Sequence, residues 1–152
     1  MGVLKKVRPI FLYMEERTMI QCYSTDITVN ENTAIPFNNI AIQKGCSAKM
    51  AGAATIHLNK VGIYMVSVDG SIEPAAAGEI SIQLSKNGIL QPQAQAIETG
   101  ATGSITNLKF ETLVQVKENN TCNCCISPTA LQVINSAEGT YSNINIVVTK
   151  IC

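Results

Sequence analysis

The sequence predicts an all-β protein, a jelly-roll sandwich of two sheets preceded by an extended N-terminal arm. Three observations predict this fold class. Short runs of alternating apolar and polar residues recur along the chain, and Gly, Pro, Asn and Ser separate them. No window shows the repeat of roughly 3.6 residues that marks an amphipathic helix. Many short strands with turns between them are typical of sandwiches and barrels, and eight to ten strands would suit a jelly roll.

The expected strands follow one another from about residue 26. Pro36 places one of them at a sheet edge or bulge, because proline cannot donate to a ladder. In another, Ile63 and Met65 are expected to share the apolar face with the neighbouring valines, opposite Tyr64 and Ser67. The expected strands cover residues 27–29, 34–42, 55–58, 62–72, 79–85, 104–116, 124–127, 130–134 and 141–151.

Two of these segments carry further detail. Residues 79–85 alternate strictly, and the Lys86-Asn87-Gly88 sequence that follows predicts a hairpin turn. In 104–116 the apolar positions change phase near Leu113, which predicts a β-bulge. The apolar face expected for 79–85 consists of Ile80, Ile82 and Leu84.

Residues 1–25 differ from the rest, being rich in charge and poor in turn residues. We therefore expect an arm over 1–25 and a jelly-roll head over 26–152. The apolar centre of the arm predicts an anchor to a partner surface, since free tails seldom carry such clusters; the alternative is a loose terminus. The charged start of the arm is followed by an apolar stretch that is too short for an export signal, so no export signal is expected. The anchor residues are Ile10, Phe11, Leu12 and Tyr13.

Composition excludes several classes of function. Apolar residues make up 46% of the chain and charged residues 14%, which argues against disorder. Lys plus Arg equals Asp plus Glu at 11 each, so no net charge attracts nucleic acid or an anionic membrane. No apolar run is long enough to span a bilayer.

Four segments, taken in order, carry a family resemblance. They are Ile35-Pro36-Phe37-Asn38, the strand 61–68 with its Gly-x-Tyr-x-x-Ser pattern, the hairpin 82–88, and the closing strand 141–151. In this order they resemble the jelly-roll heads of the tumour-necrosis-factor superfamily and of complement and collagen-like proteins. The resemblance covers about residues 27–152. The chain departs from the family pattern in the turn at 116–122 and lacks the Phe-x-Gly pair of the closing strand.

The resemblance implies a homotrimer, because family members associate through aromatic and aliphatic side chains of the inner sheet. It places five residues of this chain at or near a threefold axis. The alternative for each is a place in the core of a single chain. The five residues are Phe37, Tyr64, Phe110, Tyr141 and Ile144.

No catalytic or cofactor site is expected. The cysteines Cys122, Cys124 and Cys125 are weak metal candidates, since no second ligand pair stands at zinc-site spacing, and buried free cysteines are the favoured interpretation. The sequence alone does not decide whether Cys22 and Cys152 form a disulfide. The sequence contains no nucleophile elbow, and Gly100–Ser104 lacks the lysine and helix of a phosphate loop.

These observations favour a non-enzymatic structural protein of a virus particle, located in the virion: a trimeric capsid decoration or head-fibre protein of a bacteriophage. Its arm would bind the major capsid protein or another virion protein. Its loops Glu73–Gly78 and Gln91–Gly103 would face outward, where host-surface carbohydrate is one expected ligand. Neither nucleic acid nor membrane is an expected partner. The alternatives are the receptor-binding head of a phage tail fibre and a spore-surface or secreted trimeric ligand.

Overall fold

The computed structural model describes residues 18–117 and 128–152 of the chain. Among these residues no helix is long and apolar enough to cross a membrane. The predicted strand at 124–127 lies outside them. In chain order the strands are β1 (Met19–Val29), β2 (Thr33–Ala34), β3 (Asn39–Lys44), β4 (Ala48–Met50), β5 (Ile56–Leu58), β6 (Gly62–Pro74), β7 (Gly78–Lys86), β8 (Ile89–Gly100), β9 (Thr106–Val116), β10 (Thr129–Asn135) and β11 (Gly139–Lys150).

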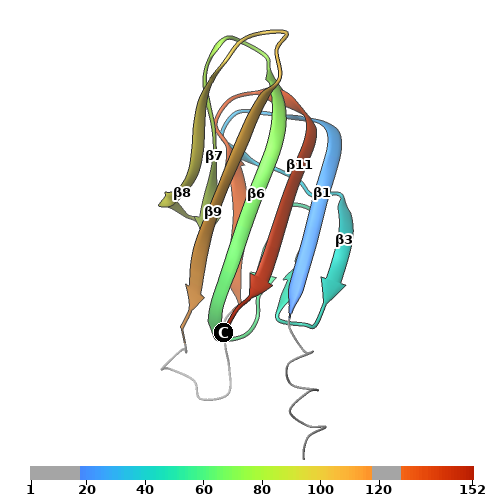
Figure 1. The fold of residues 1–152 in the computed structure, drawn as a ribbon, viewed down its shortest axis with the longest axis vertical. Helices are drawn as coiled ribbons and strands as arrows, with labels where there is room; N and C mark the ends of the chain where they lie inside the picture. The colour runs from blue at the N-terminus through green and yellow to red at the C-terminus, as the bar shows by residue number, and fades with distance from the viewer. Residues whose placement is uncertain (1–17, 118–127) are drawn as a thin grey trace, which may run out of the picture.

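The strands form two sheets that pack face to face (Figure 1). The five-stranded sheet has the order β3-β1-β11-β6-β9, and the six-stranded sheet has the order β4-β5-β10-β7-β8. Every paired strand in both sheets is antiparallel to its neighbour. β1 and β11, from opposite ends of the chain, lie side by side. The predicted all-β sandwich of two sheets is confirmed.

Alternate side chains of the long strands fill the core between the sheets. The predicted apolar face of β7 is confirmed, since Ile80, Ile82 and Leu84 are at most 1% exposed. In β6 the predicted facing is wrong: the inward valines share their face with Tyr64, and Met65 points outward. Both faces of this strand carry apolar residues, so alternation alone does not say which face is buried.

The head begins before the predicted boundary between residues 25 and 26. β1 starts at Met19 and pairs with β11 from there, so residues 19–25 belong to the sandwich. Ile20 and Cys22 are fully buried in the core. The expectation of an arm over 1–25 is therefore wrong for these residues, and residues 1–17 lie outside the described part.

Ser24 explains why the early start of β1 is hard to see in the sequence. It occupies the inward position after Cys22 and is fully buried although it is polar. Its Oγ donates to the Pro36 carbonyl at 2.7 Å and accepts from the Asn38 backbone N–H at 2.8 Å. These two bonds satisfy the hydroxyl inside the core and hold the chain between β2 and β3 beside β1.

The expected loop Gln91–Gly103 is wrong, because β8 extends to Gly100 and pairs with β7. Glutamine and alanine dominate this strand and give a weak strand signal. β8 is the edge of its sheet, and Pro92 lies where its register with β7 shifts; proline is tolerated at edges and at bulges. The other expected loop is shorter than predicted, since β6 ends at Pro74 and only 75–77 connect it to β7.

The β7–β8 hairpin is confirmed, and the predicted bulge in β9 is wrong. Asn87 and Gly88 have φ angles of 53° and 82°, the left-handed region that a tight hairpin requires. β9 pairs with β6 in unbroken register. Thr112 occupies an inward position between Phe110 and Val114, so the apolar series is interrupted without an extra residue.

Candidate association surface

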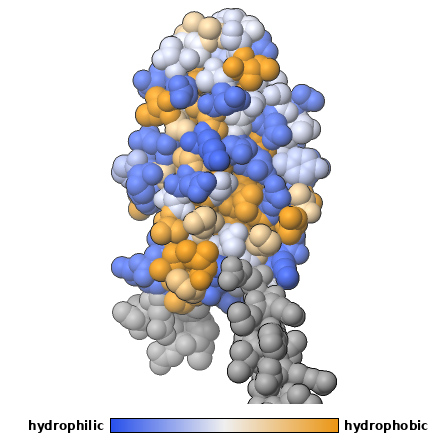
Figure 2. Space-filling model, viewed as in Figure 1, coloured by the Kyte–Doolittle hydropathy of each residue, from blue (hydrophilic) through white to orange (hydrophobic). Residues whose placement is uncertain are grey.

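The side chains of the five-stranded sheet that point away from the core form one broad outer face, which Figure 2 shows from the front. Paired residues of antiparallel strands stand side by side on the same face. The pairing registers therefore define which residues form each row across the sheet. Two halves of this face differ in chemistry.

The half near the start of β1 is partly apolar. One row across β3, β1, β11, β6 and β9 contains Lys44, Met19, Thr149, Met65 and Leu113. Met65 is 41% exposed and Leu113 is 55% exposed. Apolar side chains appear in the lower half of this face in Figure 2. Neighbouring exposed apolar side chains on a sheet face are typical of surfaces that another protein covers.

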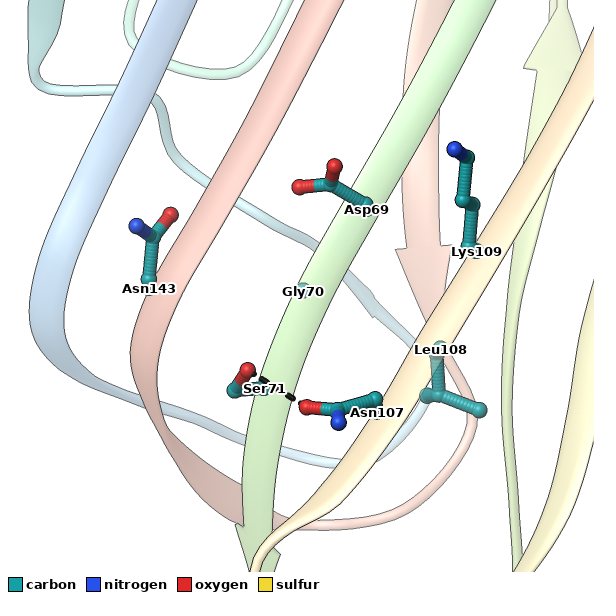
Figure 3. Close-up of a pocket in the computed structure, with 7 residues that line it drawn as sticks. All are labelled: Asp69, Gly70, Ser71, Asn107, Leu108, Lys109 and Asn143. Carbon is teal, nitrogen blue, oxygen red and sulfur yellow. Dashed lines mark hydrogen bonds between the residues drawn. The ribbon is translucent and has the colours of Figure 1, made fainter.

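The other half is polar and slightly hollowed (Figure 3). The hollow has a volume of about 330 Å³ and lies over β6, β9 and β11. Gly70 lines it without a side chain, and a Cβ there would meet Ile144 Cδ1 of the core at 2.5 Å. The polar residues around it are Asp69, Ser71, Asn107, Lys109 and Asn143.

The hollow is equipped for hydrogen bonding and not for nucleophilic catalysis. Ser71 Oγ donates to Asn107 Oδ1 at 2.7 Å, and an amide oxygen cannot take up the proton that an attacking serine must lose. The single histidine, His57, lies on β5 in the other sheet. Asp69 and Lys109 oppose each other across β6 and β9, so the hollow presents both signs of charge.

The five residues predicted at the threefold axis lie in the core of the single chain. The structure therefore places them in the core of one chain, which is the alternative to a place at the threefold axis. Because side chains alternate along a strand, contact through this sheet must use the opposite face of the same strands. The exposed fractions are 4% for Phe37, 0% for Tyr64, 7% for Phe110, 0% for Tyr141 and 0% for Ile144.

Hydrogen bonds explain how two of these aromatic residues are accommodated in the core. The Tyr64 hydroxyl donates to the Lys60 carbonyl at 2.7 Å, and the Tyr141 hydroxyl donates to Asn135 Oδ1. Burial raises the pKa of both phenols above the ordinary value, because the ionised form would lose its hydration. Both tyrosines therefore act as neutral donors within the fold.

The thiols divide by location. Cys22 is buried, whereas Cys46 and Cys152 are exposed. All three thiols are free, so the disulfide between Cys22 and Cys152 that the sequence left undecided is absent. The described residues contain no group of three or more His, Cys, Asp or Glu side chains placed to hold a metal ion. The weak metal candidates at 122–125 and the anchor residues at 10–13 lie outside the described residues.

Sequence reasoning missed the outward apolar row of Met65 and Leu113. A signal was present: Ile63 and Met65 alternate with Tyr64 and Val66, so both faces of this strand are apolar. A strand that is apolar on both faces inside an otherwise alternating sheet indicates a second buried surface. The change of phase at Leu113 instead predicts a bulge, which the unbroken register between β9 and β6 contradicts.

Comparisons with known proteins identify the fold. No protein-family model and no curated protein matches the sequence. Among solved structures, murine APRIL is similar with a TM-score of 0.68 and 9% identity over 89% of this chain and 99% of that one. The globular domain of zebrafish complement 1qA gives a TM-score of 0.63 and 7% identity over 88% and 95%.

A third similar structure is the PRD1 vertex protein P5, with a TM-score of 0.56 and 13% identity over 89% of this chain and 97% of that one. These likenesses extend over nearly the whole of each compared chain. The fold is the jelly roll of the tumour-necrosis-factor-like and complement-like heads, as the sequence resemblance implied.

Proposed function

We propose that this chain is a non-enzymatic structural protein of a bacteriophage particle, a homotrimeric decoration or head-fibre protein. The observation that carries the proposal is the partly apolar outer face of the five-stranded sheet on a tumour-necrosis-factor-like jelly roll. Three copies associate through this face, and the N-terminal arm anchors the trimer to a capsid or other virion protein. The loops at the opposite end of the head face outward.

The apolar row supports association between copies. Burying a side chain such as Leu113 stabilises a contact by about 1.5–3 kcal/mol, and three copies repeat each contact. Leu113 and Met65 lie on the two neighbouring strands at one side of the sheet. Cyclic symmetry lets one such surface be used by every copy without leaving an open end.

A vertex protein with this fold supports the virion location. The PRD1 vertex protein P5 shows that a jelly roll of this kind occurs in a protein named for a particle vertex. The polar hollow and the absence of an activated nucleophile around it support a binding or structural role over catalysis. A carbohydrate ligand on a host surface would suit the outward loops.

The direct experiment is mass spectrometry and cryo-electron microscopy of purified particles from the source of this sequence. We expect the chain in stoichiometric amounts, with trimeric density on the capsid surface. Trimeric density at the tip of a tail fibre would favour the receptor-binding alternative instead. Absence of the chain from particles, with the protein found on a spore surface or in the medium, would refute the virion assignment.

A further inference from the structure

The charges of this neutral chain separate along the long axis of the sandwich. The end at which β1 starts and β11 finishes is called here the basic end. The Lys86 amine reaches this end, where it donates to the Gln115 carbonyl at 2.8 Å. Four further lysines stand there at strand ends and in connections. They are Lys44 at the end of β3, Lys60 between β5 and β6, Lys117 after β9 and Lys150 at the end of β11.

The pairing registers show that these lysines gather at one end. Lys44 stands opposite Met19, the first residue of β1. Val116, just before Lys117, pairs with Gly62, the first residue of β6. Lys150 in turn pairs with Tyr64. Each lysine thus lies within two or three residues of the same edge of the sandwich.

The opposite end, called here the acidic end, carries only carboxylates among its described charged residues. One hollow there is lined by Glu31, Glu79 and Glu138, and a second by Glu73 and Glu138. Glu98 lies near the end of β8, opposite Ile80. No lysine lines either hollow, so these like charges stand without a neutralising partner from the described chain.

The two ends act as separate electrostatic surfaces. β1 has 11 residues, and a strand of that length spans about 36 Å. The Debye length at physiological salt is only about 8 Å, so charge at one end is screened from the other. A net charge of zero therefore conceals one surface that attracts acidic partners and another that repels them.

The basic end is also where the N-terminal segment joins the head. Thr18 Oγ1 donates to Ser47 Oγ at 3.1 Å, beside the turn that follows Lys44. The sequence before Thr18 contains four basic residues, Lys5, Lys6, Arg8 and Arg17, and two acidic ones, Glu15 and Glu16. The same end exposes two apolar side chains, Val61 at 42% and Ile151 at 43%.

We propose that the basic end docks on an acidic surface of a protein partner, with the acidic end pointing away from it. This inference rests on the proposed function and specifies which end of the head meets the particle. Lysines mixed with exposed aliphatic side chains suit a protein surface. Nucleic-acid sites instead favour arginine forks and stacked aromatic rings, and the described residues contain no arginine.

The first test measures binding of the full chain to immobilised poly-L-glutamate, used as the acidic probe, at about 50 and about 200 mM salt. The basic-end variant Lys60→Ala/Lys117→Ala is compared with Lys109→Glu, which changes the net charge by the same amount in the middle of β9. We expect the basic-end variant to bind at least about fivefold more weakly and the matched variant within about twofold of the parent. Equal weakening of both variants would overturn the proposal.

Two further outcomes would also overturn it. Tighter binding to duplex DNA or phosphatidylserine vesicles than to poly-L-glutamate, with the same dependence on Lys60 and Lys117, would assign the basic end to another class of partner. Salt-sensitive stacking of the chain without a probe, abolished by Glu31→Gln/Glu79→Gln, would make a second copy the partner.

The second test is the orientation of the head in particle density, where we expect the basic end to face the shell. An acidic end facing the shell would refute the docking inference while leaving the virion assignment intact. Absence of the chain from particles would refute the virion assignment, whereas the poly-L-glutamate result on purified chain would stand independently.

Discussion

At the residue scale, Gly70 allows the core side chain of Ile144 to cross β6. A Cβ at residue 70 would lie 2.5 Å from Ile144 Cδ1 and 3.3 Å from the Asn143 carbonyl. Ile144 is fully buried and so has little room to move. The close approach, rather than an unusual backbone angle, accounts for glycine at this position.

We expect Gly70→Ala to lower the free energy of unfolding by about 1–3 kcal/mol through overpacking. Ile144→Val removes the atom that clashes and alone costs about 0.5–1.5 kcal/mol. The loss in the free energy of unfolding of the double variant should be clearly smaller than the sum of the two single losses, as measured by urea unfolding. If the two single losses added up exactly in the double variant, a side chain at residue 70 would not contact Ile144 Cδ1.

Cys22 predicts an alkaline loss of stability. Burial raises the pKa of its thiol from the ordinary 9.0 to about 11. Below pH 9 the thiol is protonated in both states, whereas above it the unfolded chain loses the proton and the native chain keeps it. The free energy of unfolding should then fall as pH rises from 9 to 11, by at most about 1.4 kcal/mol per pH unit.

The measurement is denaturant unfolding between about pH 8 and 9.5, before the tyrosines of the unfolded chain begin to titrate near their ordinary pKa of about 10. Cys22→Ala should flatten the slope, whatever its effect on baseline stability. Cys46→Ala, at an exposed thiol, should leave the slope unchanged. An identical slope in parent and Cys22→Ala would show that this thiol does not control the alkaline limb.

At the element scale, the β7–β8 hairpin links turn chemistry to the second sheet. Asn87 adopts the left-handed φ of 53°, and its Oδ1 accepts from the Ala130 backbone N–H of β10 at 2.8 Å. The turn residue therefore fixes the hairpin register and also ties the hairpin to a third strand. This tertiary bond is not apparent from the Asn-Gly signal.

Two substitutions separate these roles. Asn87→Gly keeps the backbone conformation and loses the side-chain bond, so we expect a loss of about 1 kcal/mol. Asn87→Ala loses the bond and also strains the left-handed backbone, for a total of about 2–3 kcal/mol. Thermal unfolding of both variants checks the order, and equal losses would show that the turn conformation contributes nothing.

Elements differ in how well the sequence predicts them. β7 and the Asn87-Gly88 turn are predictable because strict alternation and turn residues coincide there. β8 is not, because an edge strand of glutamine and alanine is ordered by its pairing with β7. The early part of β1 is obscured by Ser24, whose burial depends on bonds to residues 12 and 14 positions away.

At the scale of the whole molecule, the outer face of the five-stranded sheet predicts self-association. Light scattering of the full chain should give a trimer, and its unfolding temperature should rise with protein concentration. Leu113→Glu places a charge in the apolar row and should shift the mass toward monomer. Ile105→Glu, at a residue 63% exposed in the loop before β9, should not. A monomer from the parent chain would remove the trimer from the proposed function.

The two charged ends are also a property of the whole molecule. The sequence shows only a balance of 11 basic and 11 acidic residues. Glu31 and Glu138 lie in two separate connections and Glu79 lies at the start of β7, and only the sandwich brings the three to one hollow. Composition therefore predicts no net field, whereas the fold produces two local ones.

The sequence by itself determined the all-β class, most of the strands, the hairpin turn and the likeness to tumour-necrosis-factor-like heads, because alternation and turn residues are local properties. Only the tertiary structure decided which face of β6 is buried, where β1 begins, that β8 is a strand, and that the five predicted interface residues lie in the core. Each of these depends on which partner covers a strand, and that partner comes from a distant part of the chain. The same long-range pairing decides which exposed residues form the proposed association surface and the basic end.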